Sequence, residues 1–342
     1  MSSYPSGLLS SGFAYAFVHF SVEVACFYFL FSRLSADPRW WILAMLFDAL
    51  AFIPQSFFGL LIDRFHKLNV GFIGCGLLFA ALLIPSDIFA LVVLSTGNAL
   101  AHIGGAQHTL RGARGKIAPC GIFVSGGSFG VITGQLLGAA GASIFIPIAL
   151  VLLSAVFALA VDLRKCESCE NENSGFDVAA DLSSGIVITL AFIVVAVRSY
   201  MAYAIPTEWN KTTLQAVTLF AFMGFGKMLG GILCDSIGYK KTSFISLIAA
   251  LPFLLFGNSL MLLSLLGVGL FSMTMTATVA IISSKLPHNP GFSFGITTVA
   301  LFAGTLPAFF LQPQSLFAHQ AVVLALSALA FLCINISIKK GC

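Results

Sequence analysis

The sequence predicts an all-α integral membrane protein with twelve transmembrane helices in two pseudo-symmetric six-helix bundles. Hydrophobic residues make up 58% of the chain and charged residues 9%, with a mean hydropathy of +1.00, whereas about a quarter of a soluble domain is charged. Twelve apolar runs follow one another with short connections, and each comes close to the roughly 20 residues that cross a bilayer. A short motif recurs 172 positions apart in the 342 residues, which indicates two related halves of a transporter.

The apolar runs are expected to be membrane spans in chain order. The first run is not a cleaved signal peptide, because the nine residues before and at its start carry no positive charge and the run is about twice as long as a typical signal-peptide core. It is therefore expected to remain as a span. The predicted spans cover residues 8–32, 40–62, 69–86, 88–109, 117–139, 143–162, 184–206, 213–234, 242–257, 259–284, 292–311 and 316–338.

The long polar stretch 164–183 lies between the sixth and seventh spans. It is predicted to be a solvated cytoplasmic linker between an N-terminal bundle, residues 1–163, and a C-terminal bundle, residues 184–342. Cys166 and Cys169 within it have the spacing of a zinc knuckle, but no second Cys or His pair completes four ligands. We therefore expect reduced thiols, no metal and no cofactor, and the other cysteines indicate no disulfide framework.

The distribution of Lys and Arg predicts the orientation of the chain. If the N-terminus is cytoplasmic, twelve of these residues lie in cytoplasmic segments and only Arg33, Arg39 and Lys211 lie outside. Both termini are then cytoplasmic, in a multi-pass protein of a bacterial inner or plasma membrane. The formal net charge of +4 thus reflects topology, and no nucleic-acid partner is expected. Arg198 and Lys227 remain within predicted spans.

Four glycines recur every fourth residue in the fifth predicted span. Such a row clears one helix face, so that a neighbouring backbone can approach closely. The same segment contains a G-x-S-x-G pattern, but the catalytic form of that pattern needs a turn from strand to helix. We expect helix packing and no enzyme activity, and the phosphate loop of an ATPase is absent from the sequence. The packing residues are Gly126, Gly130, Gly134 and Gly138.

The repeated motif, GLLIDRFHK at 59–67 and GILCDSIGYKK at 231–241, resembles the loop signature of the major facilitator superfamily, and the glycine row resembles its antiporter motif. A narrower likeness is to the fosmidomycin-resistance branch of exporters. It is carried by HFSVE at 19–23, GNALAH at 97–102, GKIA at 115–118, IFVSGGSFG at 122–130 and RSYM at 198–201. The sequence departs from these patterns at Ile103, Gly104 and Gln135, which leaves an uncoupled facilitator open as an alternative.

The motif and the resemblance together imply a gate at the cytoplasmic side. Asp63 and Asp235 are expected to lie at the N-termini of the eleventh and fifth spans, each in the opposite half, because a carboxylate there meets the positive end of a helix dipole. The basic residues of the motif join them in the predicted gate. The gating residues are Asp63, Arg64, Asp235 and Lys240.

A buried acid and a histidine in the first span form the predicted proton-coupling site. His19 and Glu23 are four residues apart and therefore share a helix face, near mid-depth in the membrane. An ionisable group at that depth is costly and usually faces a cavity or a partner. The alternative is a purely structural role, in which His19 and Glu23 satisfy each other or a backbone group.

Other polar residues in the spans are candidates for substrate binding. Asn98 and His102 share a face of the fourth span, and Asp48 lines either the cavity or the interface between the halves. Arg198 suits an anionic substrate, or Glu23 as its counter-ion, and a structural ion pair is the alternative. Lys227 is expected to snorkel to water, and Gln107 and His108 to be solvated. The substrate-binding candidates are Asp48, Asn98, His102, Arg198, Tyr200 and Tyr203.

These expectations combine into a secondary transporter that moves a small anionic or amphipathic organic solute by alternating access. Proton-coupled efflux is the favoured form, so the expected partners are a small-molecule substrate, protons and membrane lipid. The protein is expected to act as a monomer. The alternatives are an uncoupled facilitator or lipid-handling protein, and a transport-inactive receptor or assembly factor with the same fold.

Overall fold

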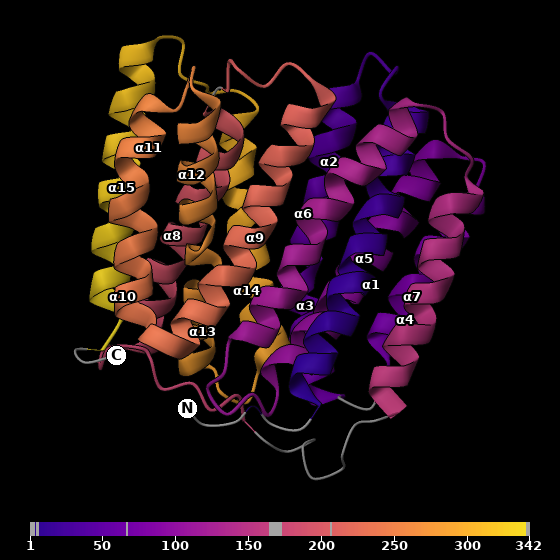
Figure 1. The fold of residues 1–342 in the computed structure, drawn as a ribbon. Helices are drawn as coiled ribbons and strands as arrows, with labels where there is room; N and C mark the ends of the chain where they lie inside the picture. Colours follow the sequence, from indigo (N-terminus) through magenta and orange to yellow (C-terminus); the bar gives the residue numbers. More distant parts are fainter. Residues whose placement is uncertain (1–3, 5–6, 66–67, 164–172, 206, 340–342) are drawn as a thin grey trace.

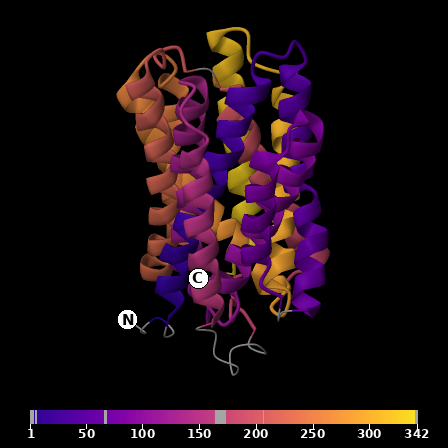
Figure 2. The ribbon, with the colours of Figure 1, turned by 90° about the vertical axis from the view of Figure 1, so that its right-hand side faces the viewer.

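The computed structural model describes residues 4, 7–65, 68–163, 173–205 and 207–339, except for the Tyr203 side chain. Within them the helices run side by side, and the connecting loops lie at the two ends of the bundle (Figures 1 and 2). We call the end that carries residues 111–117, 173–183 and 286–289 the linker end, and the opposite end the far end. The linker end is the side that the charge distribution predicts to be cytoplasmic.

The N-terminal half contains six apolar spans. The first is extended by a π-helical segment at Leu30–Leu34, and the second is interrupted before Pro54, since proline lacks the N–H that would continue the ladder. The helices are α1 (Leu8–Phe29), α2 (Trp40–Phe52) with α3 (Pro54–Arg64), α4 (Val70–Leu83), α5 (Asp87–Leu110), α6 (Ala118–Ala139) and α7 (Phe145–Leu163).

The C-terminal half repeats this number of spans. A capping box formed by Thr212 and Gln215 starts the second span of this half, Thr213–Ile237. The two side chains satisfy backbone N–H groups that have no partner within the helix. The helices are α8 (Ser184–Ala204), α9 (Thr213–Ile237), α10 (Tyr239–Phe244) and α11 (Ala250–Phe256) joined by a π-helical segment at Ile245–Ala249, α12 (Met261–Ser272) with α13 (Thr274–Lys285), α14 (Pro290–Ala308) and α15 (Leu316–Ser337).

The spans match the predicted ones closely. Eleven helices or joined helix pairs among the described residues are long and apolar enough to cross a membrane. The remaining apolar helix, α4, has 14 residues, so it is about 21 Å long and shorter than the roughly 30 Å hydrocarbon core of a bilayer. The all-α fold of twelve spans in two six-helix bundles is confirmed, with α4 as a short third span.

The glycine row packs α6 against α1. A Cβ atom at Gly134 would lie 2.6 Å from the Val24 carbonyl oxygen, and one at Gly138 would lie 2.7 Å from that of Tyr28. Gly126 and Gly130 meet the carbonyls of Ala16 and Phe20 even more closely. The four contacts on α1 are therefore also spaced by four residues, and the two backbones pack along one continuous seam, as small residues allow.

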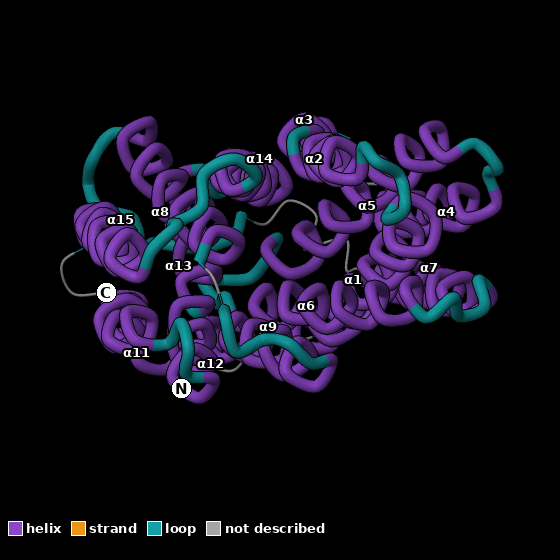
Figure 3. The backbone as a smooth tube through the Cα atoms, turned by 90° about the horizontal axis from the view of Figure 1, so that it is seen from above, coloured by secondary structure: helices purple, strands orange, loops and turns teal. Residues whose placement is uncertain are grey.

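The two halves meet along two seams that are related by pseudo-symmetry. In one seam α3 packs on α14, and in the other α9 packs on α6, as the view along the bundle shows (Figure 3). The repeated motif places Gly59 against the backbone of Gly291, and Gly231 against Ala118, where a Cβ atom would lie 3.0 Å from the Ala118 Cα atom. Equivalent motif glycines thus bring the halves together at the linker end.

The second part of the predicted linker differs from the expectation, because residues 173–183 are not simply solvated. Ser174, Phe176, Val178 and Ala179 are buried. The Gly115 N–H donates to the Ser174 carbonyl (3.0 Å), and the Ser174 N–H donates to the Pro287 carbonyl (2.9 Å). This segment therefore ties a loop of the N-terminal half to one of the C-terminal half. Cys166 and Cys169 lie outside the described residues.

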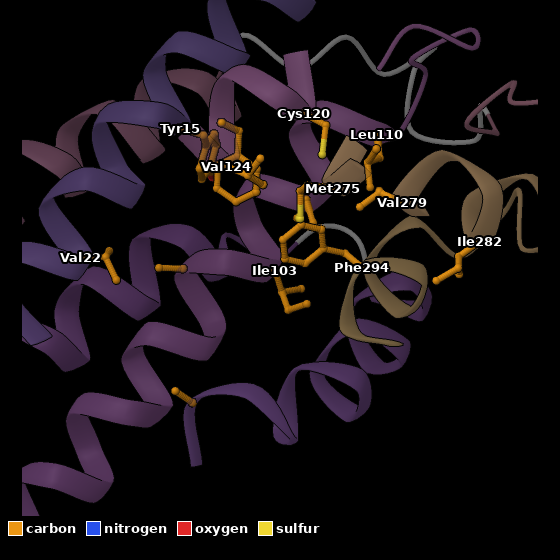
Figure 4. Close-up of a cluster of buried hydrophobic side chains, with 14 of the residues drawn as sticks. Tyr15, Val22, Ile103, Leu110, Cys120, Val124, Met275, Val279, Ile282 and Phe294 are labelled. Atoms are coloured by element: carbon orange, nitrogen blue, oxygen red, sulfur yellow. The ribbon is translucent and has the colours of Figure 1, made fainter. Parts of the chain in front are cut away.

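The apolar core crosses from one half to the other. Figure 4 shows Phe294 of α14 beside Met275 of α13 and Ile103 of α5. Large apolar side chains also lie on the outer surface, with Phe317 80% exposed and Leu163 78% exposed. In a membrane protein this surface faces lipid, so its exposure costs nothing in that environment.

Candidate functional site

Two histidines and one glutamate meet in the interior of the N-terminal half. His19 and Glu23 come from α1 and His102 comes from α5. The His102 Nε2 atom lies 3.4 Å from Glu23 Oε1, and the His19 Nε2 atom lies 3.6 Å from the same oxygen. The Asn98 side-chain amide donates to this oxygen over 3.2 Å. Residues four apart on each helix share a face, so this local geometry follows from the spacing in sequence.

The hydrogen bonds define the protonation of the two imidazoles. The Nδ1 atom of His102 lies 2.9 Å from the Asn98 carbonyl, and the Nδ1 atom of His19 lies 3.1 Å from the Phe123 carbonyl. Because a carbonyl only accepts, both Nδ1 atoms carry hydrogen in this assignment, and both Nε2 atoms present lone pairs. Yet the two Nε2 atoms are 2.8 Å apart. A proton placed between them would satisfy both, and the nearby Glu23 carboxylate would offset its charge.

The same three residues form the one described group that could hold a metal ion. The distance between the two Nε2 atoms decides against zinc in this arrangement. Two nitrogen ligands at the usual Zn–N distance lie about 3.3 Å apart in a tetrahedron, whereas the separation of 2.8 Å is that of a hydrogen bond. The site as it stands therefore fits a proton better than a tetrahedral metal ion.

Two basic residues of the C-terminal half lie near this site, Lys227 half-buried and Arg198 buried. Lys227 of α9 donates to the Ser128 hydroxyl of α6 over 2.9 Å and interacts electrostatically with both Glu23 and Arg198. It does not snorkel to water, which corrects the sequence-based expectation. Arg198 of α8 is 8% exposed, and its Nε and Nη2 atoms have no hydrogen-bond partner. No ion pair joins Arg198 to Glu23, both of which are described, so the expected counter-ion relation is absent in this state.

The other substrate-binding candidates are distributed differently. Asn98 and His102 belong to the Glu23 cluster described above. Asp48 of α2 is half-buried and lies within electrostatic reach of Glu23. Tyr200 lies toward the far end, where its hydroxyl donates to the Leu311 carbonyl over 2.9 Å. The Tyr203 side chain lies outside the described part of the chain.

Gln107 and His108 are not solvated as the sequence suggested. Gln107 is 3% exposed and donates to the Ile62 carbonyl over 3.2 Å. The His108 side chain is 9% exposed, and its Nε2 atom lies 3.4 Å from Asp162 Oδ1. Gln107 is thus held where α5 packs against α3, and His108 is held by its contact with Asp162 of α7.

Asp63 and Asp235 lie at the helix N-termini expected for them. Asp63 accepts hydrogen bonds from the backbone N–H groups of Gly291 (3.0 Å) and Phe292 (2.8 Å), in the first turn of α14. Asp235 accepts from the N–H groups of Ile117 (2.9 Å) and Ala118 (3.0 Å), where α6 begins. Each carboxylate thus caps a helix of the opposite half and meets the positive end of its dipole.

Further residues support these two caps. Arg111 lies 3.2 Å from Asp63, and the Tyr4 hydroxyl donates to Asp235 over 3.1 Å. Burial, together with the Asp235 charge, raises the pKa of Tyr4 to about 12, so this hydroxyl keeps its proton at physiological pH. The motif residues Arg64 and Lys240 are exposed. The basic partner of Asp63 is therefore Arg111, which the motif did not indicate.

No family model and no curated protein matches this sequence. Several solved structures do match it. The human organic anion transporter MFSD10 aligns with a TM-score of 0.64 at 14% identity over 97% of this chain and 99% of that one. The E. coli fucose–proton symporter FucP aligns with a TM-score of 0.60 at 14% identity, over 96% and 97%. A bacterial homologue of the iron transporter ferroportin, in an outward-facing state, gives 0.57 at 13%, over 96% and 98%.

A second FucP structure, described as a major facilitator superfamily transporter in the outward conformation, aligns with a TM-score of 0.63 at 13% identity. These likenesses extend over nearly the whole length of each chain. At such identities they establish the fold and leave the substrate open. The chain therefore has the fold of the major facilitator transporters.

Proposed function

We propose that this protein is a secondary transporter that moves a small anionic or amphipathic organic solute by alternating access, driven by protons. The N-terminal bundle, residues 1–163, and the C-terminal bundle, residues 184–342, rock about the linker between them. Both termini face the cytoplasm. The likeness to the fosmidomycin-resistance branch implies efflux by exchange with protons, whereas the coupling argued below, in which a bound proton favours an anionic solute, moves the two in the same direction. No enzyme activity is part of this proposal.

The reciprocal caps of Asp63 and Asp235 carry the proposal. Each of these carboxylates accepts two backbone N–H bonds from a helix of the other half. If the halves separate at the linker end, four charge-assisted hydrogen bonds break together. A bundle held shut by two equivalent, breakable contacts is suited to two alternating states, whereas a purely structural membrane protein has no need of such a pair.

Coupling is proposed to occur at the buried cluster of His19, Glu23 and His102. The shared proton gives this cluster a favourable charge balance, and Lys227 is the basic residue of the other half within its electrostatic reach. When the proton leaves, Glu23 attracts Lys227 more strongly, and Lys227 becomes less available to an anionic solute. Proton and solute binding are then linked through competition for one carboxylate.

Arg198 is proposed to hold the anionic part of the solute. Its buried guanidinium has two nitrogen atoms without a hydrogen-bond partner, and an unpaired charge in the interior is costly. A carboxylate or phosphate-like group would supply two parallel acceptors, which matches the planar fork of arginine. Asp48 and Asn98 complete the proposed lining, and Tyr200 and Tyr203 are proposed to lie nearer the far end.

Native cysteines provide a direct test of the gate. Cys120 and Cys234 are buried, and each lies within three residues in sequence of a residue of the Asp235 cap, whereas Cys75 is buried within the N-terminal half. In Asp63→Asn the cap loses its charge, which is worth about 1 kcal/mol, so the linker end opens more often. Alkylation of Cys120 and Cys234, followed by mass spectrometry, is expected to become several-fold faster than in the native protein.

Cys75 is the internal control and is expected to react at an unchanged rate. Asp235→Asn should reproduce the effect of Asp63→Asn, since the two caps are equivalent. Equal alkylation rates in all three proteins would argue for a transport-inactive receptor or assembly factor that has kept the fold.

A further inference from the structure

A second cluster of polar side chains lies between the Glu23 site and the linker end. Tyr15 of α1 is one helical turn from His19, on the side of the linker end. Its ring stacks on His108 of α5, with ring centroids 5.1 Å apart and an interplanar angle of 18°. His108 in turn contacts Asp162 at the end of α7 (3.4 Å). We call Tyr15, His108 and Asp162 the linker-side cluster.

The linker-side cluster leads from the interior toward the surface. Tyr15 is completely buried, and its hydroxyl has no hydrogen-bond partner. The Asp162 side chain is 25% exposed and lies one residue before the end of α7. The titratable groups that interact electrostatically with Tyr15 are Cys75 of α4 and Asp162. A buried polar group without a partner is costly, and nothing in the gate or in the Glu23 site accounts for it.

One aromatic ring contacts both the linker-side cluster and the Glu23 site. The Phe123 ring centroid lies 6.3 Å from that of Tyr15, 5.2 Å from that of His19 and 6.4 Å from that of His102. The ring also packs directly on Gly105 of α5, where no side chain could fit without moving it. An apolar ring in this position excludes water, and a dry constriction blocks proton movement.

The position of this ring depends on the other half of the protein. Phe294 of α14 packs on Phe123, with ring centroids 5.7 Å apart, and Phe294 is 2% exposed. It lies in the first turns of α14, the helix whose N-terminus Asp63 caps. When α14 leaves the N-terminal half at the linker end, Phe123 loses this neighbour and gains room to rotate.

We propose that Phe123 is a barrier between the proton site and the linker-side cluster, and that withdrawal of Phe294 opens a proton route through the N-terminal bundle to the linker end. This inference rests on the proposed function. The proton leaves the two Nε2 atoms of His19 and His102, passes by water to His108 and Asp162, and enters bulk water. Glu23 is then left with Lys227 as its nearest basic group of the other half. The proton thus has a path of its own, separate from that of the solute.

Proton leak without any solute tests this barrier. The native protein and Phe123→Ala are reconstituted in liposomes that contain a pH-sensitive dye, and a pH gradient is imposed with valinomycin and potassium present. Phe123→Ala is expected to dissipate the gradient at least fivefold faster than the native protein. Phe294→Ala is expected to raise the leak by a smaller factor, since it loosens the ring without removing it.

Phe129→Ala is the matched control, because Phe129 lies on the same helix and packs on Phe225 across the other seam (5.4 Å). It should leak no faster than the native protein. Folding of each variant is checked by its thermal unfolding midpoint, and Phe123→Leu replaces Phe123→Ala if the latter does not fold. A folded Phe123 variant without added leak overturns the barrier.

The double variant Phe123→Ala/His108→Gln tests the route. We expect the leak to fall back toward the native rate, because His108 is the relay that joins Tyr15 to Asp162. A leak that persists unchanged would overturn the route through the linker-side cluster. Since these assays contain no solute, a failure of solute transport in the native protein would count against the proposed function and leave the barrier standing.

Discussion

At the scale of single residues, the site depends on how few polar atoms the interior contains and on how they are paired. Glu23 has three donors or cationic neighbours within 3.6 Å, whereas the Arg198 guanidinium has unpartnered nitrogens. The Glu23 carboxylate therefore has its partners without any ligand, whereas the Arg198 guanidinium lacks them. We therefore assign the proton to the N-terminal half and the anionic group of the solute to the C-terminal half.

The space around His19 gives a prediction for proton coupling. The Cβ atom of an alanine at position 127 would collide with the His19 ring, whereas one at position 76 would meet nothing within 4 Å. Gly127→Ala is expected to displace His19 and to reduce proton-driven transport at least tenfold in proteoliposomes. Gly76→Ala serves as the control and should transport normally. Normal coupling in Gly127→Ala would show that the position of His19 is unimportant.

Replacement of Arg198 distinguishes a binding role from a structural one. Arg198→Met removes a buried charge that lacks partners, so the ligand-free protein should become more stable by about 1–3 kcal/mol. Binding of anionic solutes should be lost at the same time. Thermal unfolding with and without an organic anion measures both effects. Destabilisation of the ligand-free protein would instead indicate a structural ion pair.

At the scale of helices, close packing is set by small residues at regular spacing. The α1–α6 contact uses glycines four residues apart, and the same spacing brings the aligned polar residues of α1 and α5 together. These features were predictable because helical periodicity is local. The helix ends also agreed with the predicted spans to within a few residues, except that α4 is shorter and residues 173–183 are packed rather than solvated.

The glycine row predicts a specific loss of stability. A Cβ atom at Gly134 would lie 2.6 Å from the Val24 carbonyl oxygen, so α1 and α6 would have to separate. Gly134→Ala is expected to destabilise the protein by about 1–3 kcal/mol, measured by thermal unfolding in detergent. Gly185→Ala has open space around its Cβ position and should not destabilise. A Gly134→Ala midpoint equal to that of the native protein would contradict the packing role.

At the scale of the whole molecule, the duplicated motif was the most informative part of the sequence. Together with the family resemblance that it carries, it predicted the placement of both Asp63 and Asp235 at helix ends of the opposite half, where a carboxylate meets the positive end of a helix dipole. Contacts between helices far apart in sequence were less predictable. The pairing of His102 with His19, the bond from Lys227 to Ser128 and the partner of Asp63 all depend on which helices become neighbours.

Phe123 shows the limit of the sequence most clearly. It is one of 34 phenylalanines, and no local pattern distinguishes it from those that face lipid. Its position between two polar clusters follows only from the packing of α1, α5, α6 and α14. Phe123 belongs to the resembling segment 122–130, but that resemblance assigns it no role, because its role depends on the residues that α6 meets on other helices.

Proton-driven transport by the Glu23 site is the central claim, and one measurement tests it most directly. A thermal-shift screen of small organic anions first supplies a solute, and its movement across proteoliposomes is then followed with and without an imposed pH gradient. The native protein is expected to accumulate the solute against its gradient only when the pH gradient is present. Glu23→Gln, which removes the carboxylate that attracts Lys227 when the proton leaves, should bind the solute but neither accumulate it nor respond to pH. Identical pH profiles for the two proteins would contradict the account and favour an uncoupled facilitator.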